Sequence, residues 1–109
     1  MVQRRLSGEP FQYIIEKGTF FGRDFIINRN VLIPRPETEL IIHRLKSFGK
    51  VNSLLDIGTG TGCLAITASL ENLAKNIFAT DFSSLAIKTI IENIQKFNVK
   101  NIQTAKHNF

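Results

Sequence analysis

Several features are scarce in this sequence of 109 residues, and each scarcity narrows the class of protein. Cys63 is the only cysteine, so no intrachain disulfide can form, as is usual in a reducing compartment. No apolar run approaches the roughly 18 residues that cross a bilayer, and Met1 is not followed by an apolar segment of the secretory type. With 43% hydrophobic residues the chain can still form one core, so we expect a small cytoplasmic globular domain outside the membrane.

Clustered metal ligands and clustered basic residues are also missing. The single cysteine and the two histidines, His43 and His107, do not have the spacing of a metal site. The net charge is +5, but the lysines and arginines are scattered and form no dense basic run with interleaved aromatics. Direct nucleic-acid binding is therefore not expected, and an anionic partner is the minor alternative. We expect His43 on a helix surface and His107 in a loop, without a role as a general base.

The first part of the chain indicates a hairpin followed by a helix. β-branched and aromatic residues dominate residues 13–28, and a tight connection at residues 22–24 predicts a β-hairpin around Gly22. Pro36 suits the first turn of a helix, and Gly49 suits its end. Between them runs an apolar stripe that consists of Leu40, Ile41, Leu45 and Phe48.

The rest of the chain alternates between strand and helix patterns. Strand-like segments at residues 53–57, 76–81 and 101–105 are separated by helical segments at residues 61–73 and 83–97. The second helical segment carries an apolar series made of Ile87, Ile90, Ile91, Ile94 and Phe97. This alternation predicts parallel strands with right-handed crossovers, an α/β doubly wound sheet. Because three strands do not complete such a sheet, we expect a fragment with an incomplete parallel sheet.

A glycine-rich loop joins the first of these strands to the first helix, the place where open α/β sheets bind nucleotides. The loop consists of Gly58, Thr59, Gly60, Thr61 and Gly62. Glycines allow a sharp turn and let a ligand approach the backbone, and the next helix begins with free N–H groups. Asp81 ends the following strand, where its carboxylate could accept hydrogen bonds from both hydroxyls of a ribose. Phe82 could pack against a flat base at the same site.

The spacing of the glycines separates two families of nucleotide-binding proteins. A dinucleotide fingerprint, G-x-G-x-x-G, would place its third glycine at Cys63, whereas this chain has it at Gly62. The pattern D-x-G-x-G-x-G, beginning at Asp56, is the version used by S-adenosylmethionine enzymes, whose ligand has an amino-acid arm in place of a pyrophosphate. No Walker A lysine is present. The loop therefore favours a methyltransferase, with a dinucleotide-dependent oxidoreductase domain as the alternative.

Four segments together resemble one protein family in their order and spacing: residues 8–14, residues 20–22, residues 31–39 and residues 55–62. They are similar to the protein-(glutamine-N5) methyltransferases that modify peptide chain release factors, the HemK/PrmC family. The Leu-Ile-Pro-Arg-Pro-Glu-Thr-Glu run is far more specific than the glycine loop. The resemblance implies a Rossmann-like class I S-adenosylmethionine-dependent methyltransferase fold preceded by a β-hairpin. It also implies S-adenosylmethionine as the cofactor and a release factor as the protein partner.

The resemblance implies roles for particular residues as well. Residues 58–62 would surround the methionine end of the cofactor, and Asp81 would bind the ribose. Phe109 lies where the family places an aromatic or apolar side chain near the adenine, and Asn108 stands at a position that is often acidic in the family. Three residues of the proline-containing segment are expected to border the cofactor and substrate cleft: Pro34, Arg35 and Glu37.

The resemblance finally divides the chain and limits its activity. Residues 1–12 would end an N-terminal substrate-binding helical domain, residues 13–30 would form a hairpin linker, and residues 31–109 would form the first half of the methyltransferase domain. The family's Asn-Pro-Pro-Tyr motif, which holds the target amide, is absent because the three prolines are never adjacent. We therefore expect no catalytic residue in this chain. Two alternatives remain: a DNA or RNA amino-group methyltransferase, and a non-catalytic cofactor-binding fragment.

Overall fold

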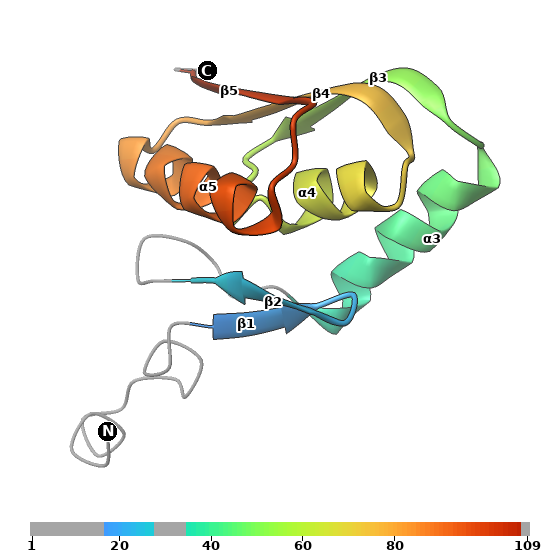
Figure 1. Ribbon diagram of the computed structural model, residues 1–109, viewed down its shortest axis with the longest axis horizontal. Coiled ribbons are helices and arrows are strands. Elements are labelled where there is room, and N and C mark those ends of the chain that lie inside the picture. The colour runs from blue at the N-terminus through green and yellow to red at the C-terminus, as the bar shows by residue number, and fades with distance from the viewer. Residues whose placement is uncertain (1–16, 28–34, 108–109) are drawn as a thin grey trace, which may run out of the picture.

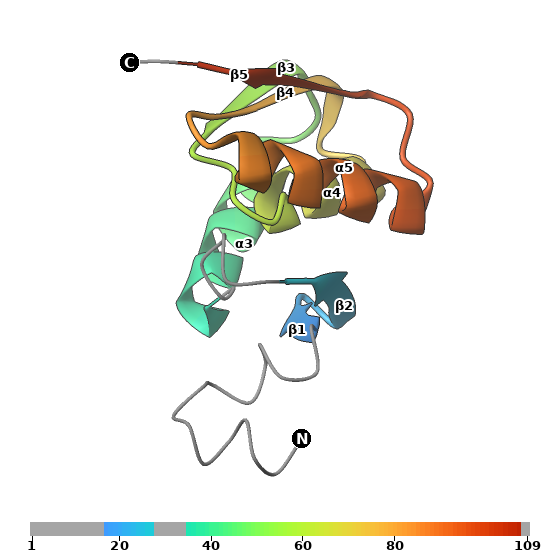
Figure 2. The same ribbon diagram turned by 90° about the vertical axis from the view of Figure 1, so that its left-hand side faces the viewer.

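The computed structural model describes residues 17–27 and 35–107 (Figure 1). Its elements lie in layers: a parallel sheet, then helices, and then a two-stranded hairpin on the side of the helices that faces away from the sheet (Figures 1 and 2). The predicted strand segment at residues 13–15 lies outside the described residues. In the part of the chain that the structure describes, no helix is long and apolar enough to cross a membrane.

The sheet contains β3 (Val51–Ile57), β4 (Ala74–Asp81) and β5 (Ile102–Lys106). All neighbours are parallel and the order is β3-β4-β5, so β4 is central. Helices α4 (Cys63–Leu70) and α5 (Ser84–Phe97) form the crossovers and lie on one face of the sheet (Figure 1). The predicted α/β arrangement with an incomplete parallel sheet is therefore confirmed.

The core lies between β4 and these helices. Ile77 and Ala79 on β4 are fully buried, as are Ile66 on α4 and Ile90 on α5. On the opposite face of the sheet, Leu55, Ile57 and Phe78 are exposed to 59%, 56% and 41%. Parallel sheets are normally covered on both faces. Within residues 17–27 and 35–107, helices cover only one of them.

Both crossover helices are followed, within two residues, by an asparagine in the left-handed region. After α4, Asn72 has φ +60°, and the Leu73 N–H donates to the Ala68 carbonyl. After α5, Asn98 has φ +54°, and the Val99 N–H donates to the Ile94 carbonyl. These six-residue closures satisfy the last carbonyls of each helix. They also explain why α4 stops at Leu70, earlier than the predicted residue 73.

The hairpin pairs β1 (Lys17–Phe20) with β2 (Arg23–Ile26) in antiparallel register. Its turn consists of Phe21 at φ +51° and Gly22 at φ +75°, the positive values that match the twist of a two-residue hairpin. The prediction of a hairpin around Gly22 is confirmed. The turn occupies residues 21 and 22 instead of the predicted residues 22–24, because Arg23 and Asp24 already belong to β2.

Aromatic packing and ion pairs hold the hairpin against the helices. The ring of Phe25 lies 6.3 Å from that of Phe20 and 4.8 Å from that of Phe97 on α5. Glu71, just after α4, accepts hydrogen bonds from Lys46 at 2.8 Å and from Arg23 at 2.9 Å. The hydrogen bond from Lys46, followed by that from Arg23, lowers the pKa of Glu71. The hairpin is thus packed on the domain through a buried apolar face and a charged rim.

The segment after residue 35 begins as a 3-10 turn, η1 (Pro36–Thr38), and continues as α3 (Glu39–Ser47). Ile42 is its buried residue, and Leu45 packs on the core as a partly buried one. The rest of the predicted apolar stripe is exposed, with Leu40 at 67%, Ile41 at 47% and Phe48 at 70%. A period-3.6 pattern identifies an apolar stripe but not the element that covers it.

Candidate functional site

The glycine loop lies at the carboxyl ends of the parallel strands, between β3 and α4 (Figure 1). Its three glycines all have positive φ: +72° at Gly58, +57° at Gly60 and +82° at Gly62. Within the loop, the Gly62 N–H donates to the Thr59 carbonyl at 2.9 Å. The N–H groups of Gly58 and Thr59 both donate to the Thr80 carbonyl, at 2.8 and 2.9 Å, so the loop stays bonded to β4 after leaving β3.

The two threonines of the loop point into the protein. Thr59 is 7% exposed and its hydroxyl donates to a carboxylate oxygen of Asp56 at 2.8 Å. Thr61 is 2% exposed and its hydroxyl accepts the N–H of Cys63 at 3.2 Å. Both hydroxyls therefore support the loop from behind. Any contact of these two residues with a ligand in front of the loop would come from their backbone.

Asp81, the last residue of β4, is bonded directly to the loop. Its Oδ2 accepts the N–H of Gly60 at 3.1 Å, and its Oδ1 accepts the N–H of Ser83 at 3.0 Å. The residue is 7% exposed, so the carboxylate is held in one orientation. Two carboxylate oxygens offer about four lone pairs, so each oxygen keeps acceptor capacity beyond these bonds. The predicted loop and the predicted acid therefore form one connected site.

A second carboxylate, that of the half-buried Asp56, accepts the Thr59 hydroxyl of the loop. Burial raises the pKa of Asp56, the hydrogen bond from Thr59 opposes this shift, and the nearby charge of Asp81 raises the pKa further. The two carboxylates thus have distinct partners: Asp56 accepts a threonine hydroxyl, whereas Asp81 accepts backbone N–H groups at the carboxyl end of the central strand.

The three glycines have different neighbours. A Cβ placed on Gly58 or Gly60 would meet no atom within 4 Å, so the space beside both residues is open. A Cβ placed on Gly62 would lie 2.4 Å from Cγ1 of Ile90 on α5. Gly62 is therefore required for the packing of the loop on α5. Gly58 and Gly60 leave room for ligand atoms against bare backbone.

The other predicted site residues are distributed unevenly. Phe82 follows Asp81 and is 71% exposed, so its ring is available at the edge of the sheet. Arg35 and Glu37 are exposed at the start of the segment leading to α3. Among the described residues, no hydrogen bond joins either side chain to the glycine loop. Pro34 and Phe109 lie outside the described residues, so their predicted roles stay predictions.

Sequence reasoning missed Asn93, a fully buried polar residue on α5. Its side-chain amide bonds to both backbone groups of Ile26 in the hairpin and to the carbonyl of Thr61 in the loop. The available signal was its position three residues after Ile90 and seven after Ala86, which places it on the buried face of the helix. A polar residue on such a face requires partners, which here come from two distant segments.

The cysteine and the two histidines lie in different surroundings. Burial raises the pKa of the Cys63 thiol to about 11, which leaves it protonated at neutral pH. His43 is exposed, as predicted, with its ring 5.4 Å from that of Phe21. The backbone N–H of His107 donates to the Asp81 carbonyl. The described part of the chain contains no group of three or more histidine, cysteine or acidic residues that could hold a metal ion.

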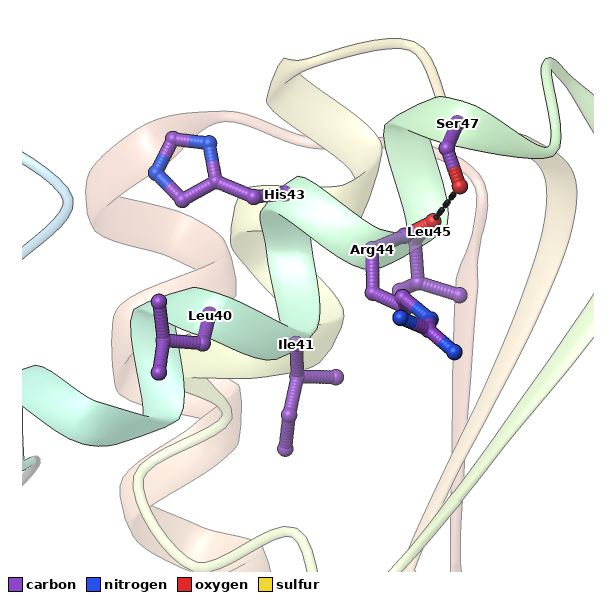
Figure 3. Close-up of a pocket in the computed structure, with 6 residues that line it drawn as sticks. All are labelled: Leu40, Ile41, His43, Arg44, Leu45 and Ser47. Carbon is purple, nitrogen blue, oxygen red and sulfur yellow. Dashed lines mark hydrogen bonds between the residues drawn. The ribbon is translucent and has the colours of Figure 1, made fainter.

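A hollow along α3 is separate from the glycine loop (Figure 3). It is lined by Leu40, Ile41, His43, Arg44, Leu45 and Ser47. Figure 3 shows Ser47 turned back onto the helix, where its hydroxyl donates to the Arg44 carbonyl at 2.6 Å. Because every lining side chain belongs to one helix, the hollow lacks the convergence of groups from several elements that marks the loop region.

Comparison with known proteins places these features in a family. Residues 35–108 match the family model described as ribosomal protein L11 methyltransferase (PrmA). The chain is 46% identical over 96 residues to the release factor glutamine methyltransferase of Staphylococcus aureus (strain NCTC 8325 / PS 47). That match covers 87% of this chain and 34% of the relative. The chain is 41% identical over 102 residues to the corresponding enzyme of Bacillus subtilis (strain 168). That match covers 87% of this chain and 35% of the relative. The chain spans about a third of the length of these curated relatives.

The fold is shared more widely than the sequence. The structure of M. jannaschii TYW2 in complex with AdoMet superposes with a TM-score of 0.67 at 16% identity, covering 83% of this chain and 42% of that chain. At this identity the likeness shows the fold alone.

The family model and the curated relatives match different extents of the chain. The family model begins at residue 35. A match to 87% of the chain is too long to fit between residue 35 and the last residue, so it must include residues before 35. The release factor enzymes therefore share part of the region that contains the hairpin as well as the glycine loop. The chain belongs to the methyltransferase family that the model describes, with the Rossmann-like fold of class I S-adenosylmethionine-dependent methyltransferases, and its homologues are release factor glutamine methyltransferases.

Proposed function

We propose that this chain is the S-adenosylmethionine-binding part of an enzyme that methylates N5 of a glutamine side chain in a peptide chain release factor. One observation supports the cofactor site above all: the Asp81 carboxylate is bonded to the Gly60 N–H at the carboxyl ends of parallel strands. Open α/β sheets bind their ligands at this edge. This bond supports the proposal that the loop and the acid bind one nucleoside together.

The residues present fit the proposed cofactor. The open space beside Gly58 and Gly60 can receive the amino-acid arm of S-adenosylmethionine against backbone. The remaining acceptor capacity of Asp81 suits the two hydroxyls of a ribose, and the exposed ring of Phe82 suits the face of an adenine. When bound, the cofactor supplies an electrophilic methyl group on its sulfonium. The chain's own residues bind and orient it.

The choice of a protein substrate rests on the relatives. The two release factor enzymes are 46% and 41% identical to the chain and match it beyond the limits of the L11 family model. A release factor substrate also implies action in the cytoplasm. Because the sequence contains no Asn-Pro-Pro-Tyr motif, the chain by itself would bind cofactor without transferring the methyl group.

Titration calorimetry with S-adenosylhomocysteine tests the cofactor site. Asp81→Asn preserves the shape of the side chain but removes a charged acceptor, and we expect binding about tenfold to a hundredfold weaker. Asp24→Asn in the hairpin is the matched control, because that carboxylate accepts only the hydroxyl of Thr19 among the described hydrogen bonds. Binding that is unchanged in Asp81→Asn, or absent in the unaltered chain, would refute the cofactor site.

The substrate requires a separate test with the complete enzyme. Labelled methyl groups from S-adenosylmethionine should appear in a release factor at a glutamine side chain. Transfer to DNA or RNA, with none to the release factor, would instead establish the amino-group methyltransferase alternative.

A further inference from the structure

The side-chain amide of Asn93 joins two segments that are far apart in the sequence. Its oxygen accepts the N–H of Ile26 at 2.7 Å, and its nitrogen donates to the Ile26 carbonyl at 3.0 Å and to the Thr61 carbonyl at 2.8 Å. The residue is fully buried. Both amide hydrogens are therefore used, one toward the hairpin and one toward the glycine loop.

The hairpin side of this contact resembles the pairing of another strand. In a hairpin with a two-residue turn, hydrogen-bonded and non-hydrogen-bonded pairs alternate from the turn, beginning with the bonded pair of Phe20 and Arg23. The pair of Lys17 and Ile26 is then non-hydrogen-bonded, which directs the N–H and carbonyl of Ile26 away from β1. The amide of Asn93 pairs with both groups and satisfies this edge of β2.

The loop side of the contact fixes the turn before α4. The Thr61 carbonyl belongs to the peptide whose N–H, on Gly62, donates to the Thr59 carbonyl at 2.9 Å. Asn93 therefore holds one end of a peptide unit whose other end closes the loop. One helical turn earlier on α5, Ile90 packs against the same Gly62. The last turn of the loop is thus held by two neighbouring side chains of α5.

We propose that Asn93 is a positioning residue that couples the docking of the hairpin to the geometry of the glycine loop, and so to the affinity for the cofactor. The cofactor part rests on the proposed function of the loop. Coupling between two sites is reciprocal. A docked hairpin raises the cofactor affinity, and bound cofactor strengthens hairpin docking by the same factor. Any partner that displaces β2 weakens cofactor binding.

The test compares two asparagines of similar chemistry. Asn93→Asp preserves the shape but places oxygen against the carbonyls of Ile26 and Thr61. Asn101 is the matched control, because its amide donates to the carbonyls of Ala74 and Lys75 at 3.2 and 3.0 Å. These bonds lie at the amino ends of the strands, whereas the glycine loop lies at their carboxyl ends. Asn101→Asp therefore loses the same number of donated bonds without touching the loop. Asn93→Ser, which leaves room for a bridging water, replaces Asn93→Asp if that variant does not fold.

Amide hydrogen exchange tests the coupling without cofactor. In Asn93→Asp, exchange of the Ile26 and Gly62 amides should rise together, by about tenfold or more, relative to the unaltered chain. In Asn101→Asp, neither amide should lose more protection than the fall in overall stability accounts for. A rise at Ile26 alone, or an equal rise in both variants, would overturn the proposal.

Calorimetry then tests the link to the cofactor. S-adenosylhomocysteine should bind about tenfold more weakly to Asn93→Asp and within about twofold of normal to Asn101→Asp. Equal weakening in the two variants would show a merely structural role and overturn the proposal. Absence of binding by the unaltered chain would refute the proposed function instead, and the exchange measurement would still decide the coupling between hairpin and loop.

Discussion

A single methyl group added at Gly62 should damage the candidate site more than any comparable change in the loop. The Cβ of an alanine there would lie 2.4 Å from Cγ1 and 2.7 Å from Cδ1 of Ile90, and 3.3 Å from Cδ1 of Ile66. At φ +82° an alanine also carries backbone strain of about 1–2 kcal/mol. Overpacking typically adds about 1–3 kcal/mol. Gly62→Ala should therefore lower the free energy of unfolding by about 2–5 kcal/mol, a large part of the roughly 5–15 kcal/mol of a domain.

Chemical denaturation of matched variants separates the two contributions. Gly60→Ala introduces a methyl group at φ +57° into open space, so it should cost only the strain, about 1–2 kcal/mol. Ile90→Ala removes the atoms that clash, so in a double-mutant cycle with Gly62→Ala the combined loss should be smaller than the sum of the single losses. Equal losses at Gly60 and Gly62, or strict additivity with Ile90→Ala, would refute this reasoning.

Two further predictions concern titratable groups behind the loop. Because the pKa of Asp56 is raised in the folded state, its stabilising contribution is complete below the ordinary value of 3.8 and is lost as the pH rises. Asp56→Asn keeps an acceptor for the Thr59 hydroxyl and should therefore raise the melting temperature at neutral pH. This gain in melting temperature should shrink as the pH falls toward 3.8. A lower melting temperature of the variant at neutral pH would contradict the prediction. With its pKa at about 11, Cys63 should react with iodoacetamide far more slowly in the folded chain than in denaturant at mildly alkaline pH, and equal rates would show that the thiol is accessible.

The features that sequence reasoning predicted well are local. The glycine spacing, the strand before it and the acid at the end of the next strand are close together in the chain. The glycines also indicate the backbone conformation. Three alternating residues of the loop have positive φ, a conformation that favours glycine at each position. Ser83 is also local evidence: it stands where the predicted helical segment starts, and its hydroxyl accepts the Ala86 N–H at 3.3 Å at the beginning of α5.

The features that were missed depend on contacts between distant segments. Phe21 occupies the first turn position at φ +51°, which is unfavourable for an aromatic residue. Its N–H donates to Glu39 at 3.1 Å and its ring lies below the Lys46 ammonium at 5.1 Å, so contacts with α3 stabilise the turn. Ile42 is buried and its apolar neighbours on α3 are not, because only the Ile42 side of the helix faces the core. Local patterns do not contain this information.

Helix α5 is the element that holds the two halves of the candidate site in register. At its start, the Ser83 N–H donates to the Asp81 carboxylate, which in turn accepts the Gly60 N–H. Further along the same helix, Ile90 and Asn93 contact the other end of the loop. The Asp81 carboxylate and the glycine loop are therefore both in contact with one helix and the residue that caps it. The sequence shows α5 only as an apolar crossover helix, but a shift of this helix would move both halves together, and the hairpin bonded to Asn93 would move with them.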